Sequence, residues 1–476
     1  MASTATAVLR RAGAMSSDWK GYPYVPDWGD PAWFRFPDVD GYRDDLGMAT
    51  YFVDGFLRGR TSGREYAFMT IVTDMHVVGK RLRASFYTFA LYDRARRRYG
   101  TYTDYDFPAP LRWRSRHKLE AARGHLALRY AAPAGPVRWE NARDGDGALR
   151  PFAWSIELHG NDHHGDRMLL ELDVDAVRPP APLGGRALGG EMMFLGLPST
   201  FSYFQSGLRM RGKVGWGEIS EEVEGEVGWI DRQWAVHDFS RHQDRKSARY
   251  RNEWRVMQFT NGWDMSCFHQ YLRPARNAVV PWTGMSAQGP APAFEIRATT
   301  RIDLDFPEFI RSPSVVRGRE MLTDGPRWFP YRYHLRAPEL GVDVTAEPWV
   351  DAPAHALPIE YWTGPVQITG RVFDAPATGV GFDERSRPWI HGFEIAEAVR
   401  RTARHLPDLE PETRQMLAYR AWETEALALR DREAARAHVS RHLVPLVSGI
   451  PAAARERLES MLQDLVTVLS SRRRLP

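Results

Sequence analysis

The chain has 476 residues, of which 43% are hydrophobic and 26% charged, and its formal net charge is +4. This composition predicts a folded globular protein of two or three domains. The basic residues occur in short, interrupted runs, which favours a solvated surface over a nucleic-acid interface. No run approaches the roughly 18 apolar residues of a membrane-spanning helix.

The single cysteine, Cys267, cannot form an internal disulfide, and this fits a cytoplasmic protein in a reducing compartment. Its strand context predicts a small buried hydrophobe rather than a nucleophile. The first 15 residues include two arginines but lack the apolar stretch of a signal peptide. We interpret them as a disordered leader.

Strand patterns separated by turn residues follow an aromatic-rich irregular segment and continue to about residue 384, which is typical of a sandwich or barrel. The expected strands cover residues 51–57, 66–73, 82–92, 154–158, 168–174, 209–214, 227–234, 297–304, 331–336, 342–346 and 366–372. A stretch rich in Pro and Gly at 179–185 interrupts them. We therefore predict a leader and irregular segment at 1–45 and β-domains at 46–205 and 206–390.

Beyond these strands, at 391–476, apolar residues recur at spacings of three or four, and Pro411 and Pro451 stand where helices begin. This pattern predicts an α-helical extension. We expect it to pack on the second β-domain within the same chain, because an amphipathic helix needs a partner face. A lid or a dimer surface is the alternative, and the oligomeric state stays open.

A hairpin is predicted at Asn261-Gly262, and a two-residue type I′ turn there would pair Trp254 with His269 and Gln258 with Met265. One face of the hairpin would then carry Trp254, Val256, Gln258, Met265, Cys267, His269 and Tyr271. Polar groups on an apolar face suit a ligand cavity, because each unpaired buried polar atom costs about 1–3 kcal/mol. A satisfied core histidine is the structural alternative for His269.

The strand at 227–234 supplies further candidates, with Arg232 and Trp234 on one face and Asp231 on the other. Asp231 is either a general acid, if burial raises its pKa, or the salt-bridge partner of an arginine. The candidate catalytic residues are Asp231, Arg232, His269 and Tyr271, and the candidate substrate-binding residues are Trp234, Trp254, Gln258 and Met265.

Several short segments between Tyr51 and Glu384 carry a resemblance to a known family. They are Ser202-Tyr203-Phe204, Ser206-Gly207-Leu208, Trp229-Ile230-Asp231-Arg232-Gln233-Trp234, Gly262-Trp263, Tyr271-Leu272-Arg273, Tyr361-Trp362-Thr363-Gly364-Pro365-Val366 and Gly379-Val380-Gly381-Phe382-Asp383-Glu384. Together they resemble the carotenoid 1,2-hydratase (hydroxyneurosporene synthase) and AttH-like family. The resemblance leaves both ends of the chain outside it.

This resemblance implies two tandem lipocalin-like β-barrel domains with a pocket for an apolar molecule. Similar proteins include cofactor-free hydratases that protonate an alkene, and related cyclases, among them Diels–Alder catalysts. The family histidine of a Trp-x-Asp-His-x-Trp pattern is replaced by Arg232, and an acid of the following strand by Arg255. Both departures weaken the hydration hypothesis, because arginine does not donate a proton at neutral pH.

Cofactor sites are not predicted. The histidine-rich segment at 159–166 falls where a hairpin must turn, which favours solvated turn residues over a metal site. The sequence has no dinucleotide-binding glycine motif after a strand, no phosphate-binding loop and no nucleophile elbow. We expect neither a metal nor an organic cofactor.

The sequence thus predicts a mainly β protein with two tandem lipocalin-like domains and a C-terminal helical extension. Its expected partner is a hydrophobic small molecule. The predicted function is a cofactor-independent cyclase or isomerase acting on an isoprenoid, polyene or polyketide-derived substrate in secondary metabolism. There are two alternatives. One is a hydratase-like lyase that adds water to an isoprenoid alkene, and the other is a non-catalytic carrier of a hydrophobic ligand.

Overall fold

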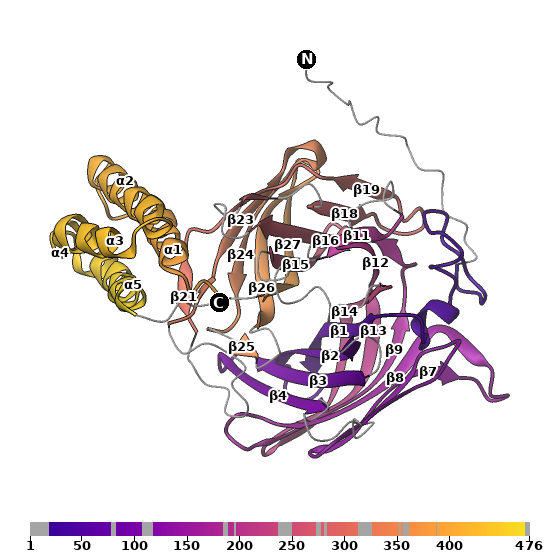
Figure 1. Ribbon diagram of the computed structural model, residues 1–476. Coiled ribbons are helices and arrows are strands. Elements are labelled where there is room, and N and C mark those ends of the chain that lie inside the picture. Colours follow the sequence, from indigo (N-terminus) through magenta and orange to yellow (C-terminus); the bar gives the residue numbers. More distant parts are fainter. Residues whose placement is uncertain are drawn as a thin grey trace.

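A computed structural model shows two curled β-sheets and a bundle of helices (Figure 1). The structure describes residues 19–77, 82–106, 118–183, 189–194, 197–236, 250–272, 278–279, 283–312, 326–351, 354–355, 361–386 and 388–471. Each sheet is bent into a half-barrel, and the predicted mainly β fold of two lipocalin-like halves with a helical extension is confirmed.

The first sheet has the strand order β4-β3-β2-β1-β14-β13-β9-β8-β7-β6-β5, with β12 pairing β14, β10 and β11. Its strands are β1 (Met48–Gly59), β2 (Glu65–Val77), β3 (Leu82–Asp93), β4 (Arg98–Asp106), β5 (Leu119–Ala121), β6 (Ala127–Ala132), β7 (Gly135–Arg143), β8 (Leu149–Asn161), β9 (Arg167–Ala176), β10 (Ala181–Pro182), β11 (Glu191–Phe194), β12 (Leu197–Ser206), β13 (Leu208–Trp216) and β14 (Ile219–Ala235).

The second sheet has the order β19-β18-β16-β15-β27-β26-β24-β23-β20, with β17 on β16 and β25 on β26. Its strands are β15 (Tyr250–Phe259), β16 (Asp264–Leu272), β17 (Ala278–Val279), β18 (Gly284–Gln288), β19 (Ile296–Thr299), β20 (Asp303–Asp305), β23 (Tyr333–Ala337), β24 (Val342–Pro348), β25 (Ala354–His355), β26 (Tyr361–Val372) and β27 (Ala375–Ser386). A separate pair joins β21 (Phe309–Arg311) to β22 (Trp328–Pro330).

The change from one sheet to the other lies later in the chain than the predicted boundary at residue 205. Strands β13 and β14 pair within the first sheet, and β14 pairs both β1 and β12. The chain therefore passes to the second sheet between Ala235 and Tyr250. The Pro/Gly-rich interruption in the sequence marks a connection inside the first sheet.

The irregular segment before β1 packs its aromatic rings against the first sheet. The rings of Phe34 and Trp234 lie 5.2 Å apart, and those of Phe36 and Tyr203 lie 5.0 Å apart. A short 3-10 helix, η1 (Asp38–Asp40), belongs to this segment. The early cluster of aromatics is thus core of the first half of the molecule.

The hairpin between β15 and β16 has a register one residue away from the predicted one. The loop has three residues, because Phe259 N–H donates to the carbonyl of Trp263, and Gly262 adopts the left-handed conformation (φ 83°). Trp254 consequently lies opposite Phe268 rather than His269. A one-residue slip exchanges the two faces of one strand, so the predicted face is wrong for β16.

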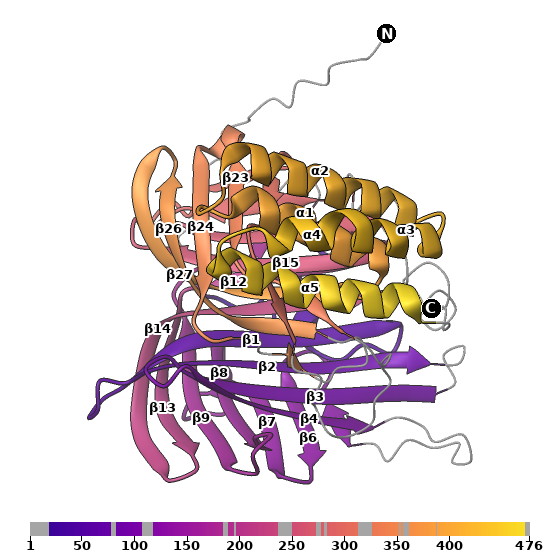
Figure 2. The same cartoon turned by 90° about the vertical axis from the view of Figure 1, so that its left-hand side faces the viewer.

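Helices follow the second sheet and pack against it (Figures 1 and 2). They are α1 (Gly392–His405), α2 (Pro411–Ala428), α3 (Arg432–His438), the π-helix η6 (Val439–Leu443), α4 (Val444–Ser448) and α5 (Ala452–Ser470). A 3-10 turn, η5 (Pro338–Leu340), connects β23 to β24. Leu458, Leu462 and Leu465 share one buried cluster with residues of the second sheet. The extension thus docks on the second β-half, as predicted.

Arg178, in the segment after β9, joins the two sheets. Its Nε lies 3.0 Å from the buried carboxylate of Asp264, and its Nη1 and Nη2 donate to the carbonyls of Gly289 (2.9 Å) and Gly262 (2.7 Å). A planar guanidinium that makes three directed contacts fixes orientation as well as distance. The first sheet is therefore held to the hairpin of the second.

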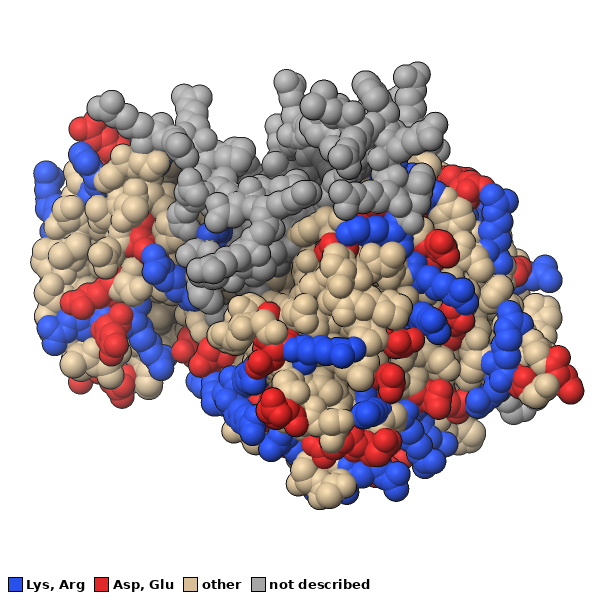
Figure 3. Space-filling view, turned by 90° about the horizontal axis from the view of Figure 1, so that it is seen from below, with Lys and Arg blue, Asp and Glu red and all other residues tan. Residues whose placement is uncertain are grey.

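The surface shown in Figure 3 carries both signs of charge, interspersed over the described residues of that face. This pattern is typical of a solvated surface. Within the described residues, the helices are all too short or too polar to cross a membrane.

We expect the contact between α5 and the β21–β22 pair to stabilise the helical extension. Asp464 is 6% exposed and accepts hydrogen bonds from Arg311 Nε (2.8 Å) and Trp328 Nε1 (3.0 Å). Asp464→Ala should lower the free energy of unfolding by about 1–3 kcal/mol, because it leaves the indole N–H buried without an acceptor. Glu459→Ala, at an exposed position of the same helix, is the control and should change it by less than about 0.5 kcal/mol. Equal denaturation midpoints for the two variants would contradict this.

Candidate active site

Three acidic side chains meet where the two sheets face each other. Asp54 lies on β1 two residues from Phe56, and the register of β1 with β14 puts Asp231 on the same surface. Glu384 lies on β27 two residues from Phe382, on the surface of the second sheet whose Phe382 ring is 5.3 Å from Phe56. Both sheets therefore contribute carboxyl groups to one place.

Asp54 is the most deeply buried of the three, with no exposed surface. Burial raises the pKa of its carboxyl well above the ordinary value, and the charges of Glu384 and Asp231 raise it further. The backbone N–H of Trp229 opposes this only in part. Burial and the neighbouring charges therefore both shift Asp54 towards its protonated form.

The other two carboxyl groups also hold protons more tightly than usual. Burial raises the pKa of Asp231 to about 7, against a hydrogen bond from Ser202 Oγ (3.0 Å) and the charge of Arg232. Burial, and then the charge of Asp231, raise the pKa of Glu384 to about 8, although a hydrogen bond with Tyr361 opposes this shift. Three such groups cannot all ionise in one low-dielectric place.

Asp231 and Glu384 are half-buried, even though β14 and β27 are central strands of their sheets. Their neighbours Ile230, Arg232 and Asp383 are buried. A residue at such a position retains accessible surface only when its side chain borders unfilled space. We infer that these two carboxyl groups face space between the sheets.

Polar atoms on the facing surfaces also lack partners. Trp229 Nε1 on β14, Gln258 Oε1 on β15 and Thr363 Oγ1 on β26 are buried, and none of them forms a hydrogen bond within the described residues. Buried polar groups in proteins almost always have a partner. These atoms therefore favour water or a ligand between the sheets.

A polar contact beside the acids ties the sheets together. Tyr92 Oη on β3 donates to the carbonyl of Thr363 (3.0 Å) and lies 3.3 Å from His355 Nε2, while Thr101 Oγ1 on β4 lies 2.6 Å from His355 Nδ1. Burial lowers the pKa of His355 to about 4, so this histidine is neutral at physiological pH. It positions the second sheet against β3 and β4.

The structure brings three of the predicted site residues to this region. Asp231 belongs to the acid cluster, and Trp254 and Gln258 lie on β15 on the surface that carries Glu384. Trp254 pairs directly with Glu384 in the register of β15 and β27.

Arg232 and Trp234 lie on the opposite face of β14, inside the first half-barrel. The Arg232 guanidinium is 3.7 Å from the centre of the Tyr51 ring, and its Nη1 donates to the carbonyl of Thr50 (3.2 Å). Trp234 packs on Phe34 of the N-terminal segment. The two residues are thus part of the first core.

Met265 and His269 lie on the opposite face of β16, inside the second half-barrel. His269 Nδ1 is 3.2 Å from Cys267 Sγ, and burial lowers its pKa well below the ordinary value, as does the charge of Arg255. The one-residue change in register explains this placement. Tyr271 is in β16, and its side chain lies outside the described part of the structure.

Asp54 and Glu384 were not among the candidates from the sequence. Asp54 interrupts the apolar run from Phe52 to Phe56, and an acid inside such a run is a signal for a buried carboxyl group. Glu384 ends one of the family-like segments. The electrostatic interaction between them joins strands more than 300 residues apart, which periodicity does not reveal.

The arrangement of the acidic side chains does not match a metal site. In the parts of the chain that the structure describes, no group of three or more His, Cys, Asp or Glu side chains is placed to hold a metal ion.

Solved structures share this fold. One is a Nitrosomonas europaea protein assigned as an AttH, with 16% sequence identity and a TM-score of 0.53. The match spans 76% of this chain and 98% of that protein. Another is kievitone hydratase from Nectria haematococca, with 12% sequence identity and a TM-score of 0.51. That match spans 77% of this chain and 98% of the hydratase. The resemblance to the AttH-like fold is thereby confirmed. No protein-family model and no curated protein matches the sequence.

His355 should make stability depend on pH. Its pKa is about 4 in the folded protein and about 6.5 when unfolded, so the folded state resists its protonation. Its contribution is present above pH 6.5 and is lost as the pH falls towards 4, by about 3 kcal/mol in total. Chemical denaturation at several pH values should show that the free energy of unfolding falls less in His355→Gln than in the wild type as the pH decreases from 6.5 to 4. His164→Gln, at an exposed position, should follow the wild-type curve; parallel curves for all three proteins would disprove the assignment.

Proposed function

We propose that the protein is a cofactor-independent acid–base enzyme that protonates a hydrophobic isoprenoid, polyene or polyketide-derived substrate between its two sheets and isomerises or cyclises it. The observation that carries this proposal is Glu384, a carboxyl group with a pKa of about 8 that borders the space between the sheets. A carboxylic acid that keeps its proton at neutral pH can donate that proton to a substrate placed beside it.

The proposed reaction begins with proton transfer from Glu384 to an alkene carbon of the substrate. The π electrons form the new C–H bond, and the neighbouring carbon becomes a cation. Phe56, Phe382 and Trp254 lie on the facing surfaces, and aromatic faces stabilise such a charge by about 0.5–2 kcal/mol each. Attack by a second double bond on the cation would then close a ring.

Loss of a proton completes the reaction. Asp231, with a pKa of about 7, is ionised in a substantial fraction of molecules at neutral pH, and as a carboxylate it can accept a proton from a carbon next to the cation. Product and substrate then have the same composition. Asp54, which is buried beside both groups, disfavours the ionised form of Glu384 whenever it is itself charged.

Hydration is the second candidate. The pair Ser202 and Asp231 offers a hydroxyl group and a carboxyl group 3.0 Å apart, a suitable place for a water molecule that would attack the cation. Kievitone hydratase, which shares the fold, is a hydratase by name. Water addition would add one H₂O to the substrate and return a proton to the site.

We expect Glu384→Gln to lower kcat by about 100-fold or more, because the amide cannot donate the proton. The assay incubates the protein with isoprenoid and polyene alkenes in D₂O and follows product mass and deuterium content. The wild-type kcat/KM should fall as the pH rises through about 8, because Glu384 then ionises. Glu226→Gln, at an exposed position of β14, is the matched control and should retain wild-type activity.

The products separate the alternatives. A product of unchanged mass in H₂O that gains deuterium in D₂O supports protonation followed by isomerisation or cyclisation, and a gain of one water supports hydration. A product of unchanged mass without deuterium means a pericyclic cyclisation that needs no acid. Stoichiometric retention of the compound without turnover means a carrier, and full activity of Glu384→Gln would reject the role of this residue.

A further inference from the structure

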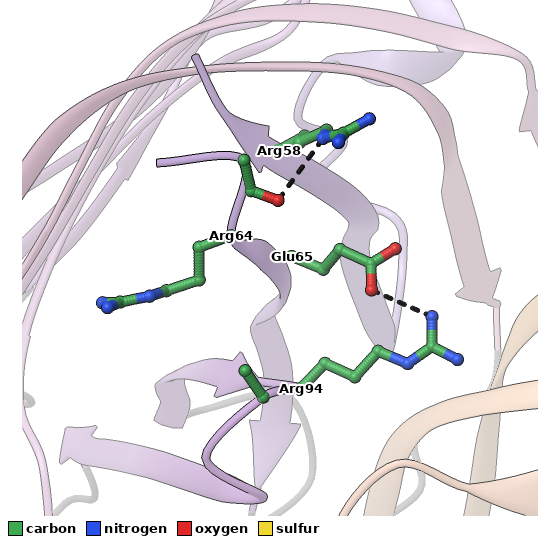
Figure 4. Close-up of a pocket in the computed structure, with 6 residues that line it drawn as sticks. Arg58, Arg64, Glu65 and Arg94 are labelled. Atoms are coloured by element: carbon green, nitrogen blue, oxygen red, sulfur yellow. Dashed lines mark hydrogen bonds and ion pairs between the residues drawn. The ribbon is translucent and has the colours of Figure 1, made fainter. Parts of the chain in front are cut away.

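A pocket of about 600 Å³ lies at one end of the first sheet, where the β1–β2 and β3–β4 connections meet the second sheet (Figure 4). It is lined by Arg58, Gly63, Arg64, Glu65, Arg94 and Ala95. Three guanidinium groups and one carboxylate give this lining a net positive charge. The proposed reaction uses none of these residues.

Two of the arginines lie close to the carboxylate. Arg94 Nη1 donates to Glu65 Oε2 (3.0 Å) and its Nη2 to Gln367 Oε1 of the second sheet (3.2 Å), while Arg58 Nε donates to the carbonyl of Gly63 (3.3 Å). Figure 4 shows the guanidinium groups of Arg58 and Arg94 on the side of the Glu65 carboxylate, and Arg64 extending the other way. Glu65 is thus one negative charge beside two positive ones.

The pocket continues the surface that carries the acids. Asp54, Phe56 and Arg58 alternate on one face of β1, so Arg58 is about 13 Å along the strand from Asp54. The Arg94 guanidinium is 4.8 Å from the centre of the Trp349 ring, and that ring is 4.9 Å from Phe56. Aromatic side chains therefore connect the charged pocket to the space between the sheets.

We propose that this pocket binds the carboxylate of an amphiphilic substrate, whose apolar body lies along Phe56 and Trp349 and reaches the acid cluster. The inference rests on the proposed function, since it names the class of substrate on which that site acts. Arginine suits this role because its planar fork donates two parallel hydrogen bonds to one carboxylate. The terminal nitrogens of Arg58 have no hydrogen-bond partner within the described residues.

Binding of a fluorescent polyene carboxylate tests this inference. Full-length protein is titrated with parinaric acid and with methyl parinarate, which has the same chain without the charge. We expect wild-type protein to bind the acid about tenfold more tightly than the ester. Arg58→Gln should remove most of this preference and leave the affinity for the ester unchanged. Arg60→Gln, at an exposed position of the same hairpin outside the pocket, should behave as wild type.

Equal affinities for acid and ester, no binding of the acid by wild-type protein, or an equal preference in Arg58→Gln would each overturn the inference. The proposed function fails separately. Glu384→Gln should keep the preference for the acid, because binding needs no proton transfer. A preference for the acid over the ester that depends on Arg58, together with unimpaired turnover in Glu384→Gln, would support the carboxylate pocket and reject the role of Glu384 as the acid.

Discussion

The burial of three carboxyl groups between two sheets is the constraint on which the candidate site depends. Asp54, Asp231 and Glu384 lie in a place of low dielectric, and ionisation of any one of them opposes ionisation of the others. Keeping Glu384 protonated at pH 7, when the unfolded chain would ionise it, costs about 3 kcal/mol. Apolar residues of similar size would fill a core without this cost. A cluster that weakens the fold in this way is the kind of arrangement found at functional sites.

The site depends on how the sheets are joined, because no single sheet contains it. Arg178 holds the first sheet to the hairpin of the second through Asp264 and two carbonyl groups. His355 and Tyr92 make a second connection close to the acids. Two polar connections at separate places restrict both sliding and rotation of one sheet on the other. The distance between the acids of the two sheets is therefore set by contacts outside the acid cluster.

The sequence predicts the elements of this fold better than the relations between them. Alternation along β14 identified Asp231 and showed that Arg232 faces away from it, but alternation does not tell which face of a strand meets a ligand. The hairpin signal at Asn261-Gly262 was in the right place. The loop has three residues rather than two, however, and this difference exchanged the faces of β16 and moved His269 away from Trp254.

The helical extension shows what a sequence pattern can settle by itself. The leucines of α5 needed a partner surface, and they lie in one buried cluster with the other helices and the second sheet, the nearest β-surface along the chain. The meeting of Asp54 with Glu384 had no such local cause. It results from the packing of two sheets whose strands are distant in the chain, and only the assembled fold brings these two residues together.

Neighbouring residues on β27 show why pairing, rather than burial alone, distinguishes a structural charge from a candidate catalytic one. Asp383 faces the interior of the second half-barrel, where Arg385 Nη2 is 2.9 Å and Arg255 Nε is 3.6 Å from its oxygens, and Arg255 also pairs with Glu253 at 2.5 Å. Asp383 and Glu253 thus each contact an arginine. Glu384, one residue further on, faces the other way and has no such partner among the described residues, only a hydrogen bond with Tyr361.

This contrast also changes the meaning of the two departures from the family pattern. Arg232 and Arg255 stand where the family pattern that the sequence resembles has a histidine and an acid, and they appeared to remove the groups that a proton transfer needs. Both arginines lie on faces turned away from the acid cluster, Arg232 against Tyr51 and Arg255 between two carboxylates. They neutralise buried charge or pack on aromatic rings inside the half-barrels. The proton donor of the proposed reaction is therefore independent of both substitutions, because it lies on the surface that the two sheets share.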